Sequence, residues 1–221
     1  MRLKFKPWAH PYLLAHQEIA LTKDDFSSPR FQELFKKDNL MLEIGAGKGD
    51  FVVAISEKFP QYFFVAVEKN LAAAAIMAKK IVESKRKNAV LIHADINDFI
   101  HLIPDGVIKN IFLNFSDPWP KVRHQKRRLT TKKMIGEYAR LLPLQGEVRL
   151  KTDNIELFNF SLENFRTHHW KIKYFTYTYN GHDPQDALTE YERNFREEGI
   201  PICRLIAKKG SKTYVTNPSS T

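Results

Sequence analysis

The 221-residue sequence contains one cysteine, Cys203, and therefore cannot form an internal disulfide bond. A single thiol fits a reducing compartment, so we expect a cytoplasmic protein. Cys203 lies within an apolar run, which favours a buried structural thiol over a reactive one. The sequence also lacks an apolar run of the roughly 18 residues that a membrane span requires, and its first residues lack the apolar stretch of a signal peptide.

Acidic residues are fewer than basic residues in this chain. Lysine and arginine total 35, aspartate and glutamate total 25, and the formal net charge is +10. Such a balance suits a polyanionic partner such as nucleic acid, although a basic solvated surface is the alternative. Hydrophobic residues make up 43% of the chain, which is enough for a core and too many for a disordered protein.

Apolar segments alternate with helical patterns along the centre of the chain, and we find no internal repeat. We expect strands at 40–44, 63–67, 90–93, 108–115 and 147–151, and helices at 29–37, 50–58, 71–83, 97–102, 130–142 and 156–167, with Thr130 as an N-cap. This alternation predicts an α/β fold with a parallel sheet and helices on both faces. Two more strands, 170–179 and 202–208, have no clear helical pattern between them. They predict an antiparallel edge and bring the number of strands to seven.

The chain length suits one domain, which we place at residues 23–209. A basic arm with aromatic and proline residues, 1–22, precedes it and is expected to be loose. A polar tail, 210–221, follows it and is also expected to be loose.

Acidic and glycine residues gather after three of the predicted strands, where open α/β sheets bind ligands. Glu43 precedes a turn with Gly45 and Gly47, which allow the backbone to approach a ligand closely. Glu68 ends the second of these strands, where a carboxylate accepts hydrogen bonds from both ribose hydroxyls. Asp95 follows the third, within reach of an adenine amino group. The pattern indicates a nucleoside-containing cofactor.

Two common nucleotide fingerprints are not met at this turn. The last glycine of the dinucleotide pattern is replaced by Asp50, and Lys48 is followed by Gly49 rather than by the serine or threonine of a phosphate-binding loop. Glu43 would oppose a pyrophosphate but suits the cationic methionine end of S-adenosylmethionine. We therefore favour S-adenosylmethionine over a dinucleotide.

The segment after the fourth predicted strand combines an acid, an aromatic residue and two prolines. Pro118 and Pro120 stiffen the chain around Trp119, whose ring is suited to packing on a flat base. Asp117 stands where the methyl group of the cofactor should point. A rigid surface loop with a buried tryptophan is the alternative.

A basic run follows immediately. Residues 121–133 include seven lysines or arginines and no acid. Its position beside Asp117 favours phosphate binding over a solvated face. We expect RNA contacts at Arg123, His124, Lys126, Arg127 and Arg128.

Four segments together resemble bacterial tRNA (guanine-N7)-methyltransferases. They are residues 43–49, residues 114–128 with Phe-Ser-Asp-Pro-Trp-Pro-Lys and Arg-His-x-Lys-Arg-Arg, residues 151–154 with Lys-Thr-Asp-Asn, and residues 189–192 with Thr-Glu-Tyr-Glu. The matches occur in the right order across residues 40–193. The resemblance implies a class I S-adenosylmethionine-dependent methyltransferase fold, which is Rossmann-like. It also implies methylation at N7 of a guanine in the variable loop of tRNA.

The resemblance also implies roles for particular residues. It implies cofactor contacts at Glu43, Gly45, Gly47, Glu68, Asp95 and Asp117, and substrate contacts at Lys121, Asp153, Thr189, Tyr191 and Glu192, with Asp117 catalytic. On spacing alone, Asp153 is a helix N-cap and Thr189 with Glu192 is a capping box. No metal is expected, and the sequence leaves open a monomer or a homodimer.

Three other functions compete with this interpretation. They are a dinucleotide-dependent oxidoreductase, an RNA-binding protein without activity, and a methyltransferase acting on a protein or a small molecule. Glu43 argues against the first, the intact acids at three strand ends argue against the second, and the basic run beside Asp117 argues against the third.

Overall fold

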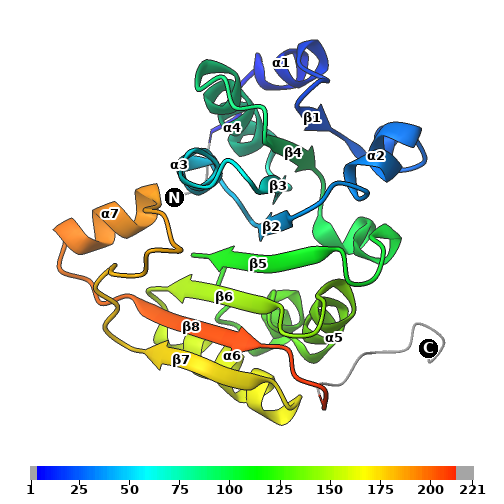
Figure 1. Ribbon diagram of the computed structural model, residues 1–221. Coiled ribbons are helices and arrows are strands. Elements are labelled where there is room, and N and C mark those ends of the chain that lie inside the picture. Colours follow the sequence, from blue (N-terminus) through cyan, green and yellow to red (C-terminus); the bar gives the residue numbers. More distant parts are fainter. Residues whose placement is uncertain (1–3, 213–221) are drawn as a thin grey trace. The chain divides into compact units, whose positions relative to one another are not determined.

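The computed structural model describes residues 4–212, and the chain divides into two compact units (Figure 1). Unit 1 comprises residues 4–103 together with 183–190. Unit 2 comprises residues 104–182 together with 191–212. The predicted domain boundaries at residues 23 and 209 stay a prediction, and residues 213–221 of the predicted tail lie outside the described part.

Unit 1 contains a four-stranded parallel sheet. Its strands are β1 (Ala20–Leu21), β2 (Leu40–Ile44), β3 (Phe63–Glu68) and β4 (Ala89–His93), in the order β1-β4-β3-β2. All five residues of β2 are buried, as its unbroken apolar run predicts. Because the strands are parallel, their carboxyl ends lie at one edge of the sheet.

The helices of unit 1 are α1 (Ala9–Ala15), α2 (Pro29–Leu34), α3 (Asp50–Lys58) and α4 (Leu71–Glu83), with 3₁₀ turns at η1 (Lys23–Asp25), η2 (Ile96–Asp98) and η3 (Ile100–Leu102). α4 begins where the side chain of Asn70 accepts a hydrogen bond from the backbone of Ala73. Its alanine-rich sequence favours the helix, and its apolar face is buried. The observed bounds of α3 and α4 are those predicted from the sequence.

The N-terminal arm is not loose along its described length, so that prediction is wrong. Ala9 and Leu13 lie one helical turn apart in α1 and are 1% and 2% exposed, and α1 packs on α4 (Figure 1). The ring of Tyr12 stacks on that of His16 with centroids 4.1 Å apart. β1 then pairs with β4. The buried face of α1 outweighs the aromatic and proline content that suggested a loose segment.

Unit 2 contains a mixed sheet. Its strands are β5 (Ile108–Asn114), β6 (Glu147–Thr152), β7 (Lys171–Thr176) and β8 (Cys203–Lys208), in the order β5-β6-β8-β7. β5 and β6 are parallel, whereas β8 pairs antiparallel with both β6 and β7. The predicted antiparallel edge is therefore confirmed. The two units contain eight strands in the described residues, so the predicted number of seven is wrong, and β1 is the strand that was missed.

The helical elements of unit 2 are η4 (Val122–Arg127), α5 (Lys132–Leu141), α6 (Ile155–Thr167) and α7 (Glu190–Glu197), the last of which begins at the final residue of unit 1. Thr131, not Thr130, is the N-cap of α5, because the Thr130 hydroxyl is bonded to that of Ser161 at 2.7 Å. α7 was not among the predicted helices, although the capping box read at Thr189 and Glu192 marks a helix start at this position. It is almost entirely polar, and Glu192 is its buried residue.

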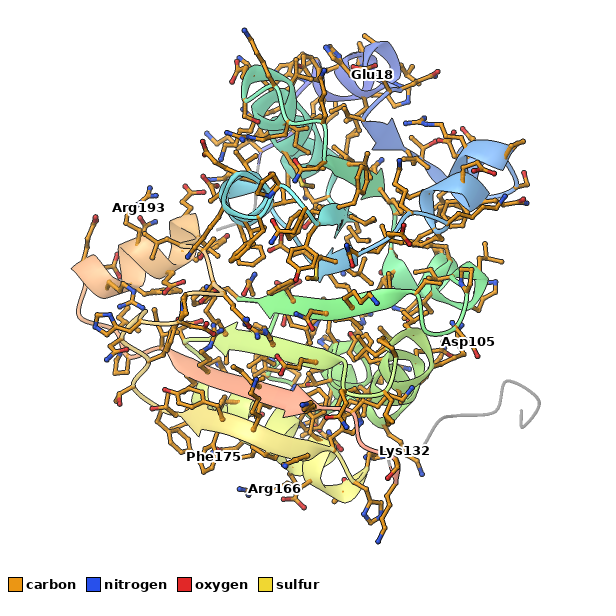
Figure 2. The ribbon with its side chains drawn as sticks, in the orientation of Figure 1. Glu18, Asp105, Lys132, Arg166, Phe175 and Arg193 are labelled. Carbon is orange, nitrogen blue, oxygen red and sulfur yellow. The ribbon has the colours of Figure 1, made fainter. Side chains whose placement is uncertain are left out.

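The outer strand β7 exposes aromatic side chains. Tyr174 and Phe175 are each 44% exposed. The guanidinium of Arg166, on α6, lies 5.5 Å from the centre of the Phe175 ring, and both residues are labelled in Figure 2. A cationic group held over the ring shields part of an otherwise apolar edge.

Burial and nearby charges shift the pKa values of two groups in unit 2. Burial alone raises the pKa of the Glu147 carboxyl, but hydrogen bonds from Lys173 and Arg149 and their charges bring that pKa below its ordinary value of 4.5. Burial, together with the charge of Asp153, raises the pKa of the Cys203 thiol. Cys203 is 3% exposed, which confirms the predicted buried thiol.

Candidate active site

The three acid-bearing strand ends of unit 1 lie side by side. Ile44 is in register with Val67, and Glu68 with His93. The glycine turn, Glu68 and Asp95 therefore follow neighbouring parallel strands at one edge of the sheet, as predicted. Glu43 lies one residue inside β2 and is 5% exposed.

The glycine turn is held by hydrogen bonds from its own backbone. The N–H groups of Gly45 and Ala46 both donate to the carbonyl of Val67, at 2.9 and 3.0 Å. The N–H of Gly47 donates to Glu68 Oε2 at 2.9 Å. Gly47 has a φ of +56°, and a Cβ built there would meet no atom within 4 Å. Open space beside a backbone of this conformation permits the close approach of a ligand.

Hydrogen bonds from neighbouring residues also hold the carboxylates of Glu68 and Asp95 in place. Glu68 Oε1 accepts a hydrogen bond from the backbone N–H of Asn70 at 2.7 Å. Asp95 accepts bonds from both the backbone and the side chain of Asn97, at 3.0 and 2.9 Å. Burial pushes the pKa of the Asp95 carboxyl upward, but the bonds from Asn97 and the charges of Lys69 and Lys23 bring it below its ordinary value. Asp95 is therefore a charged acceptor at neutral pH.

Residues 183–190 pack against the glycine turn within unit 1. Lys48 Nζ lies 2.9 Å from Glu190 Oε1 and 3.0 Å from Oε2. Lys58 Nζ donates to the carbonyl of Asp186 at 3.1 Å, and Thr189 is 6% exposed. No local pattern in the sequence indicates these contacts, because they join residues more than a hundred positions apart.

In unit 2 the carboxyl ends of β5 and β6 are also adjacent. Asn114 is in register with Lys151, and the N–H of Phe115 donates to the carbonyl of Lys151 at 2.8 Å. The segments that follow carry Asp117 and Asp153, both exposed. These two predicted site residues therefore lie at the same edge of a parallel strand pair.

The loop around Asp117 has an unusual backbone. Phe115 and Trp119 are not glycines, yet their φ angles are +50° and +44°. Each such conformation costs on the order of 1–3 kcal/mol and persists only where surrounding contacts impose it. The Arg127 guanidinium lies 4.9 Å from the centre of the Trp119 ring, and the centres of the His124 and Trp119 rings are 5.9 Å apart with their planes perpendicular. The tryptophan predicted to face a base is thus already in contact with the basic run.

The basic run itself is divided. Lys121, Arg123, Lys126 and Arg127 are exposed, and His124 is half-buried. Arg128 does not fit the prediction of an RNA contact. Its side chain is 1% exposed and its guanidinium is bonded to Glu156 at 2.6 Å, so it points into unit 2 rather than to solvent.

The start of α7 joins the same region of unit 2. Lys151 Nζ lies 2.6 Å from Glu192 Oε2, and their side chains are 1% and 2% exposed. Arg196 also pairs with Glu192, at 2.7 Å. The ring of Tyr191 stacks beside that of Phe115 at 6.1 Å. Glu192, which was predicted to contact the substrate, is therefore held in a buried ion pair.

Each unit thus brings together part of the predicted set. Unit 1 gathers Glu43, Gly45, Gly47, Glu68 and Asp95, and unit 2 gathers Asp117, Lys121, Asp153 and the basic run. Across residues 4–212 the structure contains no group of three His, Cys, Asp or Glu side chains arranged to hold a metal ion. In the same range no helix is long and apolar enough to cross a membrane.

Known proteins similar to this chain decide its family. A family model described as "Putative methyltransferase" matches residues 37–205. A tRNA (guanine-N(7)-)-methyltransferase of Limosilactobacillus reuteri (strain DSM 20016) is 38% identical over 210 residues, covering 94% of this chain and 99% of that protein. One from Staphylococcus haemolyticus (strain JCSC1435) is 39% identical over 213 residues, covering 94% and 98%. The chain belongs to the tRNA (guanine-N(7)-)-methyltransferase family.

Solved structures agree on the fold of this family member. The 16S rRNA methyltransferase KamB is similar with a TM-score of 0.65 at 14% identity, covering 87% of this chain and 99% of that one. Precorrin-6y C5,15-methyltransferase from Geobacter metallireducens GS-15 gives 0.55 at 16% identity, covering 88% and 95%. The predicted class I methyltransferase fold is confirmed, and the oxidoreductase alternative is set aside.

Proposed function

We propose that this chain transfers a methyl group from S-adenosylmethionine to N7 of a guanine in the variable loop of tRNA, forming 7-methylguanosine. The observation that carries the proposal is the similarity, over nearly the whole chain, to enzymes named for this reaction. The basic run beside Asp117 supports an RNA substrate over a protein or a small molecule. Because tRNA is the proposed substrate, we also propose a cytoplasmic location. The protein would act as either a monomer or a homodimer.

The residues of unit 1 fit S-adenosylmethionine. Gly47 leaves room for a ligand against the backbone, and Glu68 and Asp95 are held by neighbouring amides as acceptors for hydroxyl and amino groups. Glu43 supplies a further carboxylate beside the turn, suited to a cationic ligand. When bound, the cofactor supplies an electrophilic methyl group on a sulfonium.

The reaction asks little proton chemistry of the protein. N7 of guanine has an exposed lone pair and no proton, so no general base is required. The chain must instead hold the base in line and favour the positive charge that develops on its ring. Asp117 is suited to both tasks, because its carboxylate can accept hydrogen bonds from the Watson–Crick edge of guanine or from the cofactor. We therefore assign Asp117 as the catalytic residue.

Substrate binding is assigned mostly to exposed residues of unit 2, and Thr189, of unit 1, is the buried exception. Lys121 and Asp153 would contact the target nucleotide, together with Thr189 and Tyr191. Arg123, His124, Lys126 and Arg127 would contact the RNA backbone. The target base is stacked within folded tRNA, so we expect it to be turned out before methylation. In this assignment Glu192 holds α7 on β6 and does not touch the substrate.

The test is incubation with unmodified tRNA and labelled S-adenosylmethionine, followed by nucleoside analysis for 7-methylguanosine. Asp117→Ala and Asp117→Asn should lower the rate by orders of magnitude while tRNA affinity changes little. Glu163→Gln, an exposed acid on α6 of the same unit, is the matched control and should keep full activity.

Two results would contradict the proposal. Full activity of Asp117→Ala would remove the catalytic assignment. Label recovered in a nucleoside other than 7-methylguanosine, or none transferred to tRNA, would remove the reaction itself.

A further inference from the structure

The loop that carries Asp117 has few backbone N–H groups of its own. Pro118 and Pro120 have no N–H group, and Trp119 between them has a φ of +44°. The carbonyl groups of Pro118 and Trp119 accept hydrogen bonds from a side chain instead.

Arg128 donates these hydrogen bonds. Its Nε donates to the carbonyl of Pro118 at 2.8 Å, and its Nη2 donates to the carbonyl of Trp119 at 3.4 Å. The guanidinium lies 4.6 Å from the centre of the Phe160 ring. With 1% of its side chain exposed, Arg128 is fixed among these groups and is not a member of the solvent-facing run.

The same guanidinium reaches the other acid-bearing segment of unit 2. Nη2 donates to Glu156 Oε1 at 2.6 Å. Glu156 lies in the first turn of α6, and that helix begins directly after Asp153 and its cap Asn154. One side chain therefore connects the loop of Asp117 with the helix that follows Asp153.

We propose that Arg128 is a positioning residue that sets the Asp117 loop against the start of α6, rather than a phosphate contact. Its planar fork donates to two successive carbonyls and a carboxylate at once, which lysine cannot reproduce. The proposal rests on the assigned role of Asp117. It predicts that Arg128 controls turnover through the conformation of residues 117–120 and leaves tRNA affinity unaffected.

The experiment compares Arg128→Lys and Arg128→Ala with Arg166→Ala, a matched arginine that lies over a ring elsewhere in unit 2. Both Arg128 variants should lower kcat by about 100-fold, the cost of misplacing a reacting group by roughly 1 Å. Their dissociation constants for tRNA, and the dependence of those constants on salt, should match the wild type. Arg166→Ala should behave as the wild type in all three measurements.

A second measurement separates positioning from loss of folding. The chain has three tryptophans, Trp8, Trp119 and Trp170, so fluorotryptophan labelling gives three ¹⁹F signals. In Arg128→Lys the signal of Trp119 should shift or broaden, whereas that of Trp170, buried against Phe165 in unit 2, should stay in place. Glu156→Gln keeps both carbonyl bonds of Arg128 and should give a smaller change of the same kind, which provides a test if Arg128→Ala does not fold.

Three outcomes would overturn the proposal. One is weaker tRNA binding with a flatter salt dependence in Arg128→Lys, which would make Arg128 a phosphate contact. Another is reduced turnover with an unchanged Trp119 signal, and the last is wild-type turnover. If Asp117→Ala were fully active while the Trp119 signal still responded to Arg128, the assigned role of Asp117 would fail and the structural link would stand.

Discussion

The buried ion pair between Lys151 and Glu192 in unit 2 gives a prediction with a definite size. The two groups are 2.6 Å apart and almost wholly buried, and Glu192 also pairs with Arg196. Removing one partner of a buried pair costs about 3–5 kcal/mol, because the remaining charge is poorly solvated. Glu192→Gln removes the charge that faces both cations, and we expect it to lower the free energy of unfolding by that amount.

The complementary change should be milder. Lys151→Met leaves Glu192 with Arg196 at 2.7 Å, so we expect a loss of about 1–2 kcal/mol. Because the two groups interact, the double variant should lose less than the sum of the two single losses, by about 1–3 kcal/mol. Urea unfolding followed by circular dichroism measures all three variants.

Glu190→Gln is the control. Glu190 begins the same helix and pairs with Lys48, but both side chains are about a third exposed. An exposed pair contributes about 0–1 kcal/mol, so this variant should unfold close to the wild type. A loss below about 1 kcal/mol for Glu192→Gln, or single losses that simply add, would refute the reasoning.

Three further properties of the two units can be tested by substitution. Gly47→Ala should cost about 1–2 kcal/mol of backbone strain. Its added methyl group enters the open space that the cofactor is proposed to occupy, so S-adenosylmethionine binding measured by calorimetry should weaken at least about tenfold. Gly49→Ala, with its Cβ 2.5 Å from a side-chain atom of α4, should instead lose about 2–4 kcal/mol in urea unfolding; equal effects of the two changes on both assays would contradict this. The lowered pKa of Glu147 means that its stabilising contribution is present above pH 4.5 and is lost as pH falls through the lower folded value, so Glu147→Gln should flatten the acid limb of stability against pH, and an unchanged limb would count against it. Changing Arg123 and Arg127 to Ala should make the slope of log affinity for tRNA against log salt shallower by about 0.7–0.9 for each phosphate that the variant no longer neutralises, whereas an unaltered slope would mean that neither arginine contacts a phosphate.

Much of the fold could be read from the sequence because local patterns dictate it. The apolar run of β2 and the alanine-rich α4 have the observed bounds, and the rule that ligands bind past parallel strand ends brings Glu68 and Asp95 to one edge. α1 and α7 could not be read in this way. α1 has 7 residues, too few to be stable alone in water, and it packs on α4. α7 has only two aromatic residues, Tyr191 and Phe195, among polar ones, and its buried residue is a glutamate whose partner Lys151 lies 41 positions away.

Arg128 shows a different limit, because its residue type predicted an exposed RNA contact whereas its side chain is buried. A run of like charges suggests one exposed surface, yet these residues form a 3₁₀ turn, in which side chains three positions apart share a face. The N–H of Arg128 bonds to the carbonyl of Gln125 at 3.0 Å, and both residues are on the less exposed side, while Lys126 and Arg127 are exposed. The sequence did contain one relevant signal: the two prolines that flank Trp119 leave their loop with fewer backbone donors, which favours bonds from a nearby side chain. A count of positive charges treats Arg128 and its neighbours alike, whereas its buried guanidinium, bonded to the carbonyls of Pro118 and Trp119, separates it from them.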